Sequence, residues 1–193
     1  MDNLSNIVSD FASISLDQMD AVKLMNRTDT KFAFRADQLP LLLKKIIPFY
    51  RVLAINDRYV QDYKSLYFDT HDRKFYLDHH NRRVNRNKIR FREYVDSDLT
   101  FLEIKTKNNK GKTIKKRIKV DSISDKLTLK QEEYISKIIG RNLNVEAKQW
   151  INFSRITLVH KVQTERLTID INLTFENEQR SGDFKKIVIA EVK

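Results

Sequence analysis

The sequence predicts an α+β fold in which antiparallel strands form a sheet and helices pack outside it. In most segments charged and apolar side chains alternate with a period of two, as expected of strands, whose successive side chains point to opposite faces. Turn signals rich in Asp, Asn and Gly separate these segments, for example at residues 96–98 and 108–111. A few other segments place apolar residues at helical spacing and suit helices that cover one face of the sheet.

Two helices and one strand are expected in the first quarter of the chain. Ser15 can cap a helix over residues 16–25. Residues 27–34 then alternate with period two and predict a strand. A second helix over residues 38–49 has a leucine-rich side that suits the core, and Pro48 marks its end because proline cannot continue a helix.

The later elements follow from the same signals. Further strands are expected at residues 50–55, 63–69, 152–161, 166–175 and 186–193. A short helix is expected at residues 73–79, and a longer one within residues 125–142 is capped near Thr128 and stopped by Gly140. The last strand is still running where the chain stops, so we expect a further C-terminal element.

Three basic strands carry the clearest pattern in the chain. Their sequences are KIRFR at residues 88–92, EIKTK at residues 103–107 and KKRIK at residues 115–119. In each, the charged side chains share one face and the apolar side chains share the other. Three consecutive strands are therefore predicted to have one charged face and one apolar face.

The charged faces of all the predicted strands are strongly basic as a set. They carry thirteen bases: Arg27, Lys31, Lys88, Arg90, Arg92, Lys105, Lys107, Lys115, Arg117, Lys119, Arg155, Arg166 and Lys193. They carry four acids: Asp29, Glu103, Asp170 and Glu191. An ordinary solvated face mixes charges, because like charges opposite one another on neighbouring strands repel. We therefore predict that a polyanion binds this face; if the sheet closes, the face lines a tunnel.

The composition sets the outer limits of the interpretation. The chain has 193 residues and a formal net charge of +11, which predicts one domain and a polyanionic partner such as nucleic acid, phosphates or an anionic membrane. It has no cysteine, which excludes disulfides and thiolate chemistry and is compatible with the cytoplasm. The acidic N-terminus is unlike a secretory signal, and no apolar run approaches the roughly 20 residues that span a bilayer. We expect a soluble, cytoplasmic protein with no transmembrane segment in this chain.

Several segments, in order along the chain, resemble the VTC domain. They are RTDTKF at residues 27–32, YFDT at residues 67–70, RNKIRFR at residues 86–92 and FLEIK at residues 101–105. This family is the polyphosphate polymerase branch of the triphosphate tunnel metalloenzymes, which are related to the CYTH triphosphatases. The first strand reads R-x-D-x-K where the CYTH signature has E-x-E-x-K, which favours the VTC branch.

The resemblance implies an eight-stranded antiparallel closed β-barrel, a triphosphate tunnel, with helices packed outside. Residues 1–26 would form a helical segment packed on the barrel, and residues 27–193 the tunnel domain, without its last C-terminal element. The implied activity is metal-dependent phosphoryl transfer from ATP to inorganic polyphosphate, with Mn²⁺ or Mg²⁺ as the cofactor. No specific nucleic acid is expected as a partner.

The resemblance also implies roles for individual residues. The expected catalytic residues are Lys31, Arg90, Arg92 and Lys105. Phosphate binding is expected from the same four residues and from Lys88, Lys115, Arg117, Arg155 and Arg166. In the third basic strand, Arg117 resembles the basic residue of the family, and Lys115 is the alternative match. Glu191 matches the metal-binding glutamate of the last strand, and Glu103 and Asp170 are further acidic candidates.

Three other functions stay open at this point. The protein could bind or sense polyphosphate without chemistry, or it could hydrolyse triphosphates. A nucleic-acid-binding module is less expected, because the residues between the bases are aliphatic and carboxylates accompany the bases. The aromatic residues Tyr67, Phe68, Phe75 and Tyr76 are accordingly interpreted as core and not as a platform for stacking bases.

Overall fold

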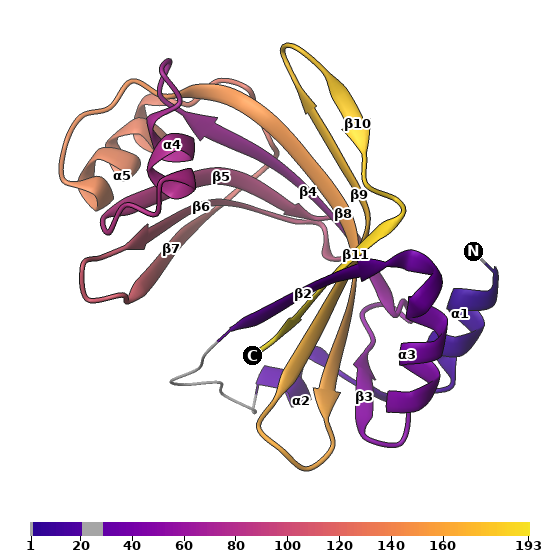
Figure 1. Ribbon diagram of the computed structural model, residues 1–193. Helices are drawn as coiled ribbons and strands as arrows, with labels where there is room; N and C mark the ends of the chain where they lie inside the picture. The colour runs from indigo at the N-terminus through magenta and orange to yellow at the C-terminus, as the bar shows by residue number, and fades with distance from the viewer. Residues whose placement is uncertain (1, 21–28) are drawn as a thin grey trace. The chain divides into compact units, whose positions relative to one another are not determined.

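The computed structural model of the protein describes residues 2–20 and 29–193 and has the predicted α+β composition (Figure 1). The chain divides into two compact units, which are described separately. Unit 1 consists of Met1–Tyr63, Asn152–Thr174 and Gly182–Lys193, and unit 2 consists of Lys64–Ile151 and Phe175–Ser181.

The described residues of unit 1 form three helices and most of the N- and C-terminal strands. Its elements are α1 (Asp2–Ser9), β1 (Ala12–Ile14), α2 (Leu16–Asp20), β2 (Thr30–Arg35), a 3₁₀ turn (Ala36–Gln38), α3 (Leu39–Ile46), β3 (Tyr50–Leu53) and β11 (Ile187–Val192). Four strands have residues in both units: β4 (Val60–Asp69), β8 (Glu146–His160), β9 (Arg166–Asn177) and β10 (Ser181–Asp183).

Unit 2 contains the three basic strands and two helices. Its elements are α4 (Lys74–His80), β5 (Arg86–Tyr94), a 3₁₀ turn (Val95–Ser97), β6 (Leu99–Lys107), β7 (Thr113–Val120) and α5 (Leu129–Ile139). The predicted elements from residue 38 onward therefore form at nearly the predicted positions. The helix predicted over residues 16–25 and the strand predicted over residues 27–34 lie partly outside the described residues, as does Arg27.

The prediction of an eight-stranded closed barrel is wrong. The strands form an open, 11-stranded sheet in the order β2-β11-β9-β8-β4-β5-β6-β7, with β1, β3 and β10 attached beside this path. Within the described residues β2 and β7 stand at opposite ends of this order and do not pair with each other. Both end strands are exposed along most of their length.

The physical reason for this error is that alternation defines the two faces of each strand but not the pairing of the end strands. A strand with one charged and one apolar face fits an open sheet as well as a closed one. Closure followed only from the family resemblance. The faces themselves were predicted correctly, as the cores of the two units show.

The core of unit 1 lies between two helices and the apolar face of its strands. Val8 of α1 and Leu43 of α3 pack with Ile156, Ile169 and Val188 from β8, β9 and β11. The β11 strand pairs antiparallel with both β2 and β9. The amphipathic helices thus cover one face of these strands and leave the other face to charged side chains.

The core of unit 2 is built in the same way. Ile89 and Phe91 of β5 and Leu102 of β6 pack with Phe75 of α4 and Ile135 of α5, and both helices lie beside these strands in Figure 1. As predicted, α5 begins at a cap on Thr128, whose hydroxyl accepts a hydrogen bond from the Gln131 N–H, and it ends at Gly140 with φ of 82°. Across the described residues, no helix is long and apolar enough to cross a bilayer.

Candidate functional site

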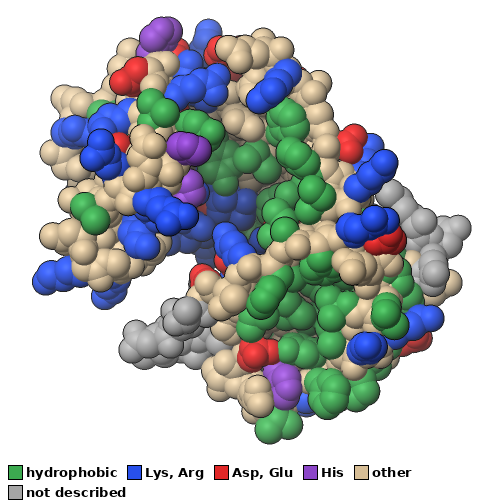
Figure 2. All heavy atoms as spheres, viewed as in Figure 1, with side chains coloured by type: hydrophobic (Ala, Val, Ile, Leu, Met, Phe, Trp, Pro, Cys, Tyr) green, Lys and Arg blue, Asp and Glu red, His purple; other side chains and the backbone are tan. Residues whose placement is uncertain are grey.

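The face of β5, β6 and β7 opposite the core is a regular array of basic side chains, which we call the basic face. The strand registers align Lys88 with Lys105 and Lys105 with Lys115, so three lysines form one row across three strands. The basic face comprises nine bases and one acid: Arg86, Lys88, Arg90, Arg92, Lys105, Lys107, Lys115, Arg117, Lys119 and Glu103. Figure 2 shows lysine and arginine side chains gathered over this part of unit 2.

Glu103 lies at the centre of the basic face and its side chain is completely buried. Its Oε2 accepts hydrogen bonds from Nε and Nη2 of Arg90 at 2.9 and 2.6 Å, and its Oε1 pairs with the ammonium of Lys115. Burial of the carboxyl raises its pKa, but Arg90 and Lys115 outweigh burial and lower the pKa to about 2. Glu103 is therefore a permanent anion that holds two of the bases in place.

The neighbouring strand β4 orients the two arginines of β5. Arg90 donates from Nη1 to the Tyr67 hydroxyl at 2.8 Å, and Arg92 donates from Nε to the Ser65 hydroxyl at 3.0 Å. Burial raises the pKa of Tyr67, but Arg90, Arg92 and Lys88 outweigh burial and lower it below the ordinary value. The half-buried Tyr67 hydroxyl therefore lies among three positive charges.

Lys105 is a partly buried base of this face, aligned with a lysine on each side. Its ammonium makes no ion pair within the part of the chain that the structure describes. Burial lowers its pKa to about 7, and the repulsion of Arg90 and Lys115 adds to that effect. Lys105 is thus on the verge of losing its proton at neutral pH, and an anion beside it would restore the charge.

The predicted site residues of unit 1 form a second group, in which bases and acids are paired. Arg155 makes a two-point ion pair with Asp170, with Nε–Oδ1 and Nη2–Oδ2 distances of 2.5 and 2.7 Å. Its guanidinium also lies over the rings of Tyr63 and Phe153, 5.3 and 5.0 Å from their centroids. The charge of Arg155 is therefore already satisfied within the protein.

Glu191 lies between two lysines in the same unit. Its carboxylate is 2.6 Å from the ammonium of Lys193 and 3.5 Å from that of Lys31. Burial raises the pKa of Glu191, but the two lysines outweigh burial and lower the pKa below its ordinary value. Arg166, at the start of β9, exchanges backbone hydrogen bonds with Lys193.

The three predicted metal ligands do not present a ready metal site. Glu103, Asp170 and Glu191 are each engaged by one or two bases, so a cation would have to displace a lysine or arginine to reach them. No group of three His, Asp or Glu side chains in the described residues could hold a metal ion. Binding of Mn²⁺ or Mg²⁺ stays a prediction.

The structure therefore places the predicted site residues in two groups. Unit 2 holds Lys88, Arg90, Arg92, Glu103, Lys105, Lys115 and Arg117, and unit 1 holds Lys31, Arg155, Arg166, Asp170 and Glu191. The roles assigned to them stay predictions. Sequence reasoning missed Ser65 and Tyr67, which orient the arginines. Their signal was the spacing of two residues between them in a predicted strand, which places both on one face.

Solved structures share the fold of this chain. A candidate adenylate cyclase from Bacillus halodurans is 11% identical, with a TM-score of 0.55 over 85% of this chain and 78% of the other. A candidate adenylyl cyclase from Hippeastrum, described as having a dominant triphosphatase activity, is 14% identical, with a TM-score of 0.47 over 85% of this chain and 79% of the other. At such identities the first match shows the fold alone, and the second is too distant to support an argument. A search of curated proteins found no significant match.

The family of the chain follows from its own sequence. The family model of the VTC domain matches residues 26–193, so the chain belongs to the VTC domain family. The resemblance found in the sequence is thereby confirmed.

Proposed function

We propose that the basic face binds a triphosphate or polyphosphate and that the protein transfers the γ-phosphoryl group of ATP to a polyphosphate chain. The observation that carries this proposal is the row of Lys88, Lys105 and Lys115, three like charges directly opposite one another on adjacent strands. Such a row is destabilising by itself, because the charges repel. A bound polyanion turns this repulsion into attraction.

The spacing of the row suits a chain of phosphates. Side chains directly opposite on neighbouring strands are about 5 Å apart at their Cβ atoms, so the three ammonium groups can bind non-bridging oxygens at intervals along an extended phosphate chain. Arg117 lies in the row next to the three lysines and Arg92 one row further on, and each can donate two parallel hydrogen bonds to non-bridging oxygens. Membership of the VTC family supports phosphate as the anion.

The proposed reaction needs little covalent chemistry from the protein. An oxygen of the terminal phosphate of the acceptor attacks the γ-phosphorus of ATP, the bond from that phosphorus to the β-phosphate oxygen breaks, and ADP leaves. The product is a polyphosphate chain longer by one phosphate. No general base is required, because the attacking oxygen is already anionic.

The side chains of the basic face would act on the charge of the transferred group. The equatorial oxygens of the transferred phosphoryl group carry the negative charge of the transition state. Arg90, held by Tyr67 and Glu103, can neutralise that charge without reorganising, and the ammonium of Lys105 can add to this effect. We also propose that Lys31, Arg155 and Arg166 bind phosphate, as predicted. Substituting each of these residues separately tests its role.

The test is to incubate the protein with ATP, a short polyphosphate primer and Mn²⁺, and to separate the products by size. Polyphosphate that lengthens as ADP accumulates is the expected result. Release of free phosphate without lengthening would replace the polymerase with a hydrolase. If neither product forms although triphosphate binds tightly, the protein is a polyphosphate sensor and the transfer step is wrong.

A further inference from the structure

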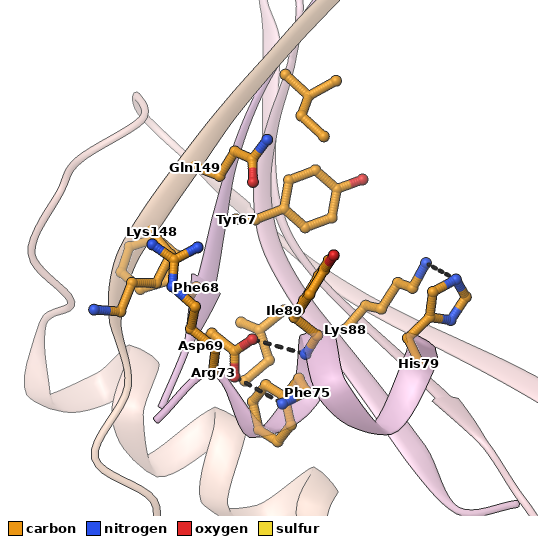
Figure 3. Close-up of a pocket in the computed structure, with 12 residues that line it drawn as sticks. Tyr67, Phe68, Asp69, Arg73, Phe75, His79, Lys88, Ile89, Lys148 and Gln149 are labelled. Atoms are coloured by element: carbon orange, nitrogen blue, oxygen red, sulfur yellow. Dashed lines mark hydrogen bonds between the residues drawn. The ribbon is translucent and has the colours of Figure 1, made fainter. Parts of the chain in front are cut away.

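A pocket of about 260 Å³ opens in unit 2 beside the lysine row (Figure 3). Its walls include four aromatic side chains from the end of β4 and from α4: Tyr67, Phe68, Phe75 and Tyr76. Phe68 and Phe75 are core residues as predicted, but Tyr76 is 58% exposed and not part of the core. One of the four aromatic residues, Tyr76, is therefore exposed and can contact a ligand in the pocket.

Asp69 holds this wall in place without a ligand. Its carboxylate accepts hydrogen bonds from the backbone N–H groups of Phe75 and Tyr76, each at 2.8 Å. Both bonds are drawn toward α4 in Figure 3, where Asp69 lies below Tyr67. The first turn of α4 is thus fixed to the end of β4, so the pocket is preorganised.

Two polar groups of the pocket are available for a ligand. The Gln149 amide faces the same space as the Tyr67 ring in Figure 3, and it makes no hydrogen bond within the described residues. The Arg73 guanidinium also lines the pocket and makes no ion pair there. An amide offers a donor and an acceptor side by side, which matches the edge of a nucleobase.

Lys88 connects the pocket to the basic face. It lines the pocket, where its ammonium lies 3.2 Å from Nε2 of His79, and it is also the first member of the lysine row opposite Lys105. A ligand that fills the pocket can therefore reach the row with an attached anionic chain. An inorganic polyphosphate has no part that would gain from an aromatic pocket.

We infer that this pocket binds the base of a nucleoside triphosphate whose phosphates lie along the row of Lys88, Lys105 and Lys115. The inference rests on the proposed function and adds that a nucleotide, not an inorganic triphosphate, is the preferred ligand of the basic face. Tyr76 and Tyr67 supply ring faces for stacking, and Gln149 binds the edge of the base.

The test compares the binding of ATP and of inorganic triphosphate by calorimetry in two variants of α4. Tyr76→Ala removes an exposed ring and keeps the backbone bond to Asp69, and Leu77→Ala removes a 47% exposed side chain that does not line the pocket. We expect Tyr76→Ala to weaken ATP binding about tenfold, as loss of one stacked ring does, and to leave inorganic triphosphate binding unchanged. Leu77→Ala should change neither. A further variant, Gln149→Ala in β8, should weaken ATP binding severalfold.

Three results would overturn the inference, and they are distinct. Equal affinity of the wild type for both ligands, unaltered by Tyr76→Ala, would show that the pocket binds no base while the basic face still binds phosphate. An equal loss for both ligands in Tyr76→Ala would show a general structural effect. If neither ligand binds the wild type, the proposed function fails first and the inference with it.

Discussion

The two groups of charged residues differ in how their charge is balanced. In unit 1, Arg155 is paired with Asp170, and Glu191 is shared by Lys31 and Lys193, so two acids compensate most of the charge of these three bases. On the basic face of unit 2, nine bases share the single acid Glu103. A similar strand pattern therefore produces bases that are mostly paired with acids in unit 1 and a large excess of positive charge in unit 2. The uncompensated face is the one that needs an anion.

The largest expected effect is on stability, and it should be larger for substitution of Glu103 than for substitution of Asp170. Replacing Glu103 by alanine leaves Arg90 buried without its partner and removes the only negative charge from the basic face. We expect Glu103→Ala to lower the free energy of unfolding by about 3–5 kcal/mol. Asp170→Ala, at a pair that is partly exposed, should cost about 2 kcal/mol. Denaturant unfolding of both variants measures the difference.

A ligand provides the control for this pair of variants. Inorganic triphosphate should restore part of the stability of Glu103→Ala, because the ligand supplies the missing negative charge, and it should restore much less in Asp170→Ala. Equal stabilities of the two variants, with or without triphosphate, would mean that the two groups do not differ as described.

The acid sensitivity of the protein is the next effect. The folded pKa of Glu103 is about 2 and its ordinary value is 4.5, so its contribution to stability is complete above pH 4.5 and is lost as the pH falls toward 2. We expect the wild type to lose stability across this window more steeply than Glu103→Gln, which has no such carboxyl. Thermal unfolding at a series of pH values measures this, and identical profiles would contradict it.

Lys105 should take up a proton when an anion binds. In the free protein its pKa is about 7, because burial and the neighbouring Arg90 and Lys115 disfavour the charge, whereas the ordinary value is 10.5. A bound triphosphate raises this pKa, so binding at pH 8 should take up nearly one proton and affinity should fall as the pH rises above 7. Calorimetry in buffers of different ionisation enthalpy measures the uptake.

The variant Lys105→Met should lose this proton uptake, whereas Lys116→Met, on the opposite face of β7, should keep it. Uptake that persists in Lys105→Met would assign the proton to another group and would remove the argument that Lys105 lacks a partner.

The smallest expected effect is that of metal removal on binding. In the proposed function the bases of unit 2 contact phosphate without a metal, and every predicted acidic ligand is already engaged by a base. We expect EDTA to change the dissociation constant of triphosphate by less than about threefold, which is below 1 kcal/mol. Loss of binding in EDTA would show that a metal, and not the lysine row, carries the interaction.

The sequence was sufficient for the parts of the fold that depend on local patterns. Alternation located β5, β6 and β7 and assigned their faces, and capping signals located α5, because both depend on a few neighbouring residues. The pattern also singled out Glu103 as the one acid among the bases. Its burial and its ion pairs with Arg90 and Lys115 followed only from the fold, because the register aligns Glu103 with Arg90 and Arg117 and not with Lys115.

Long-range features could not be obtained in this way. The curvature of the whole sheet decides whether β2 and β7 pair, and no local pattern records this curvature. The prediction of a closed barrel was therefore wrong. Tyr67 was interpreted as core because an aromatic residue between apolar neighbours suits a core strand. Its hydroxyl binds Arg90, which lies 23 positions later in the chain, and only the fold brings the two together.

The most direct test of the central claim is the affinity for inorganic triphosphate of Lys105→Met beside that of Lys116→Met. The two lysines are removed from adjacent strands but from opposite faces of the sheet, since Lys105 is aligned with Lys115 and Lys116 with Ile104. If the basic face binds the anion, Lys105→Met should weaken binding about 10- to 100-fold, the value of one charge-assisted contact, and Lys116→Met should leave it nearly unchanged. Equal affinities of the two variants would contradict the account.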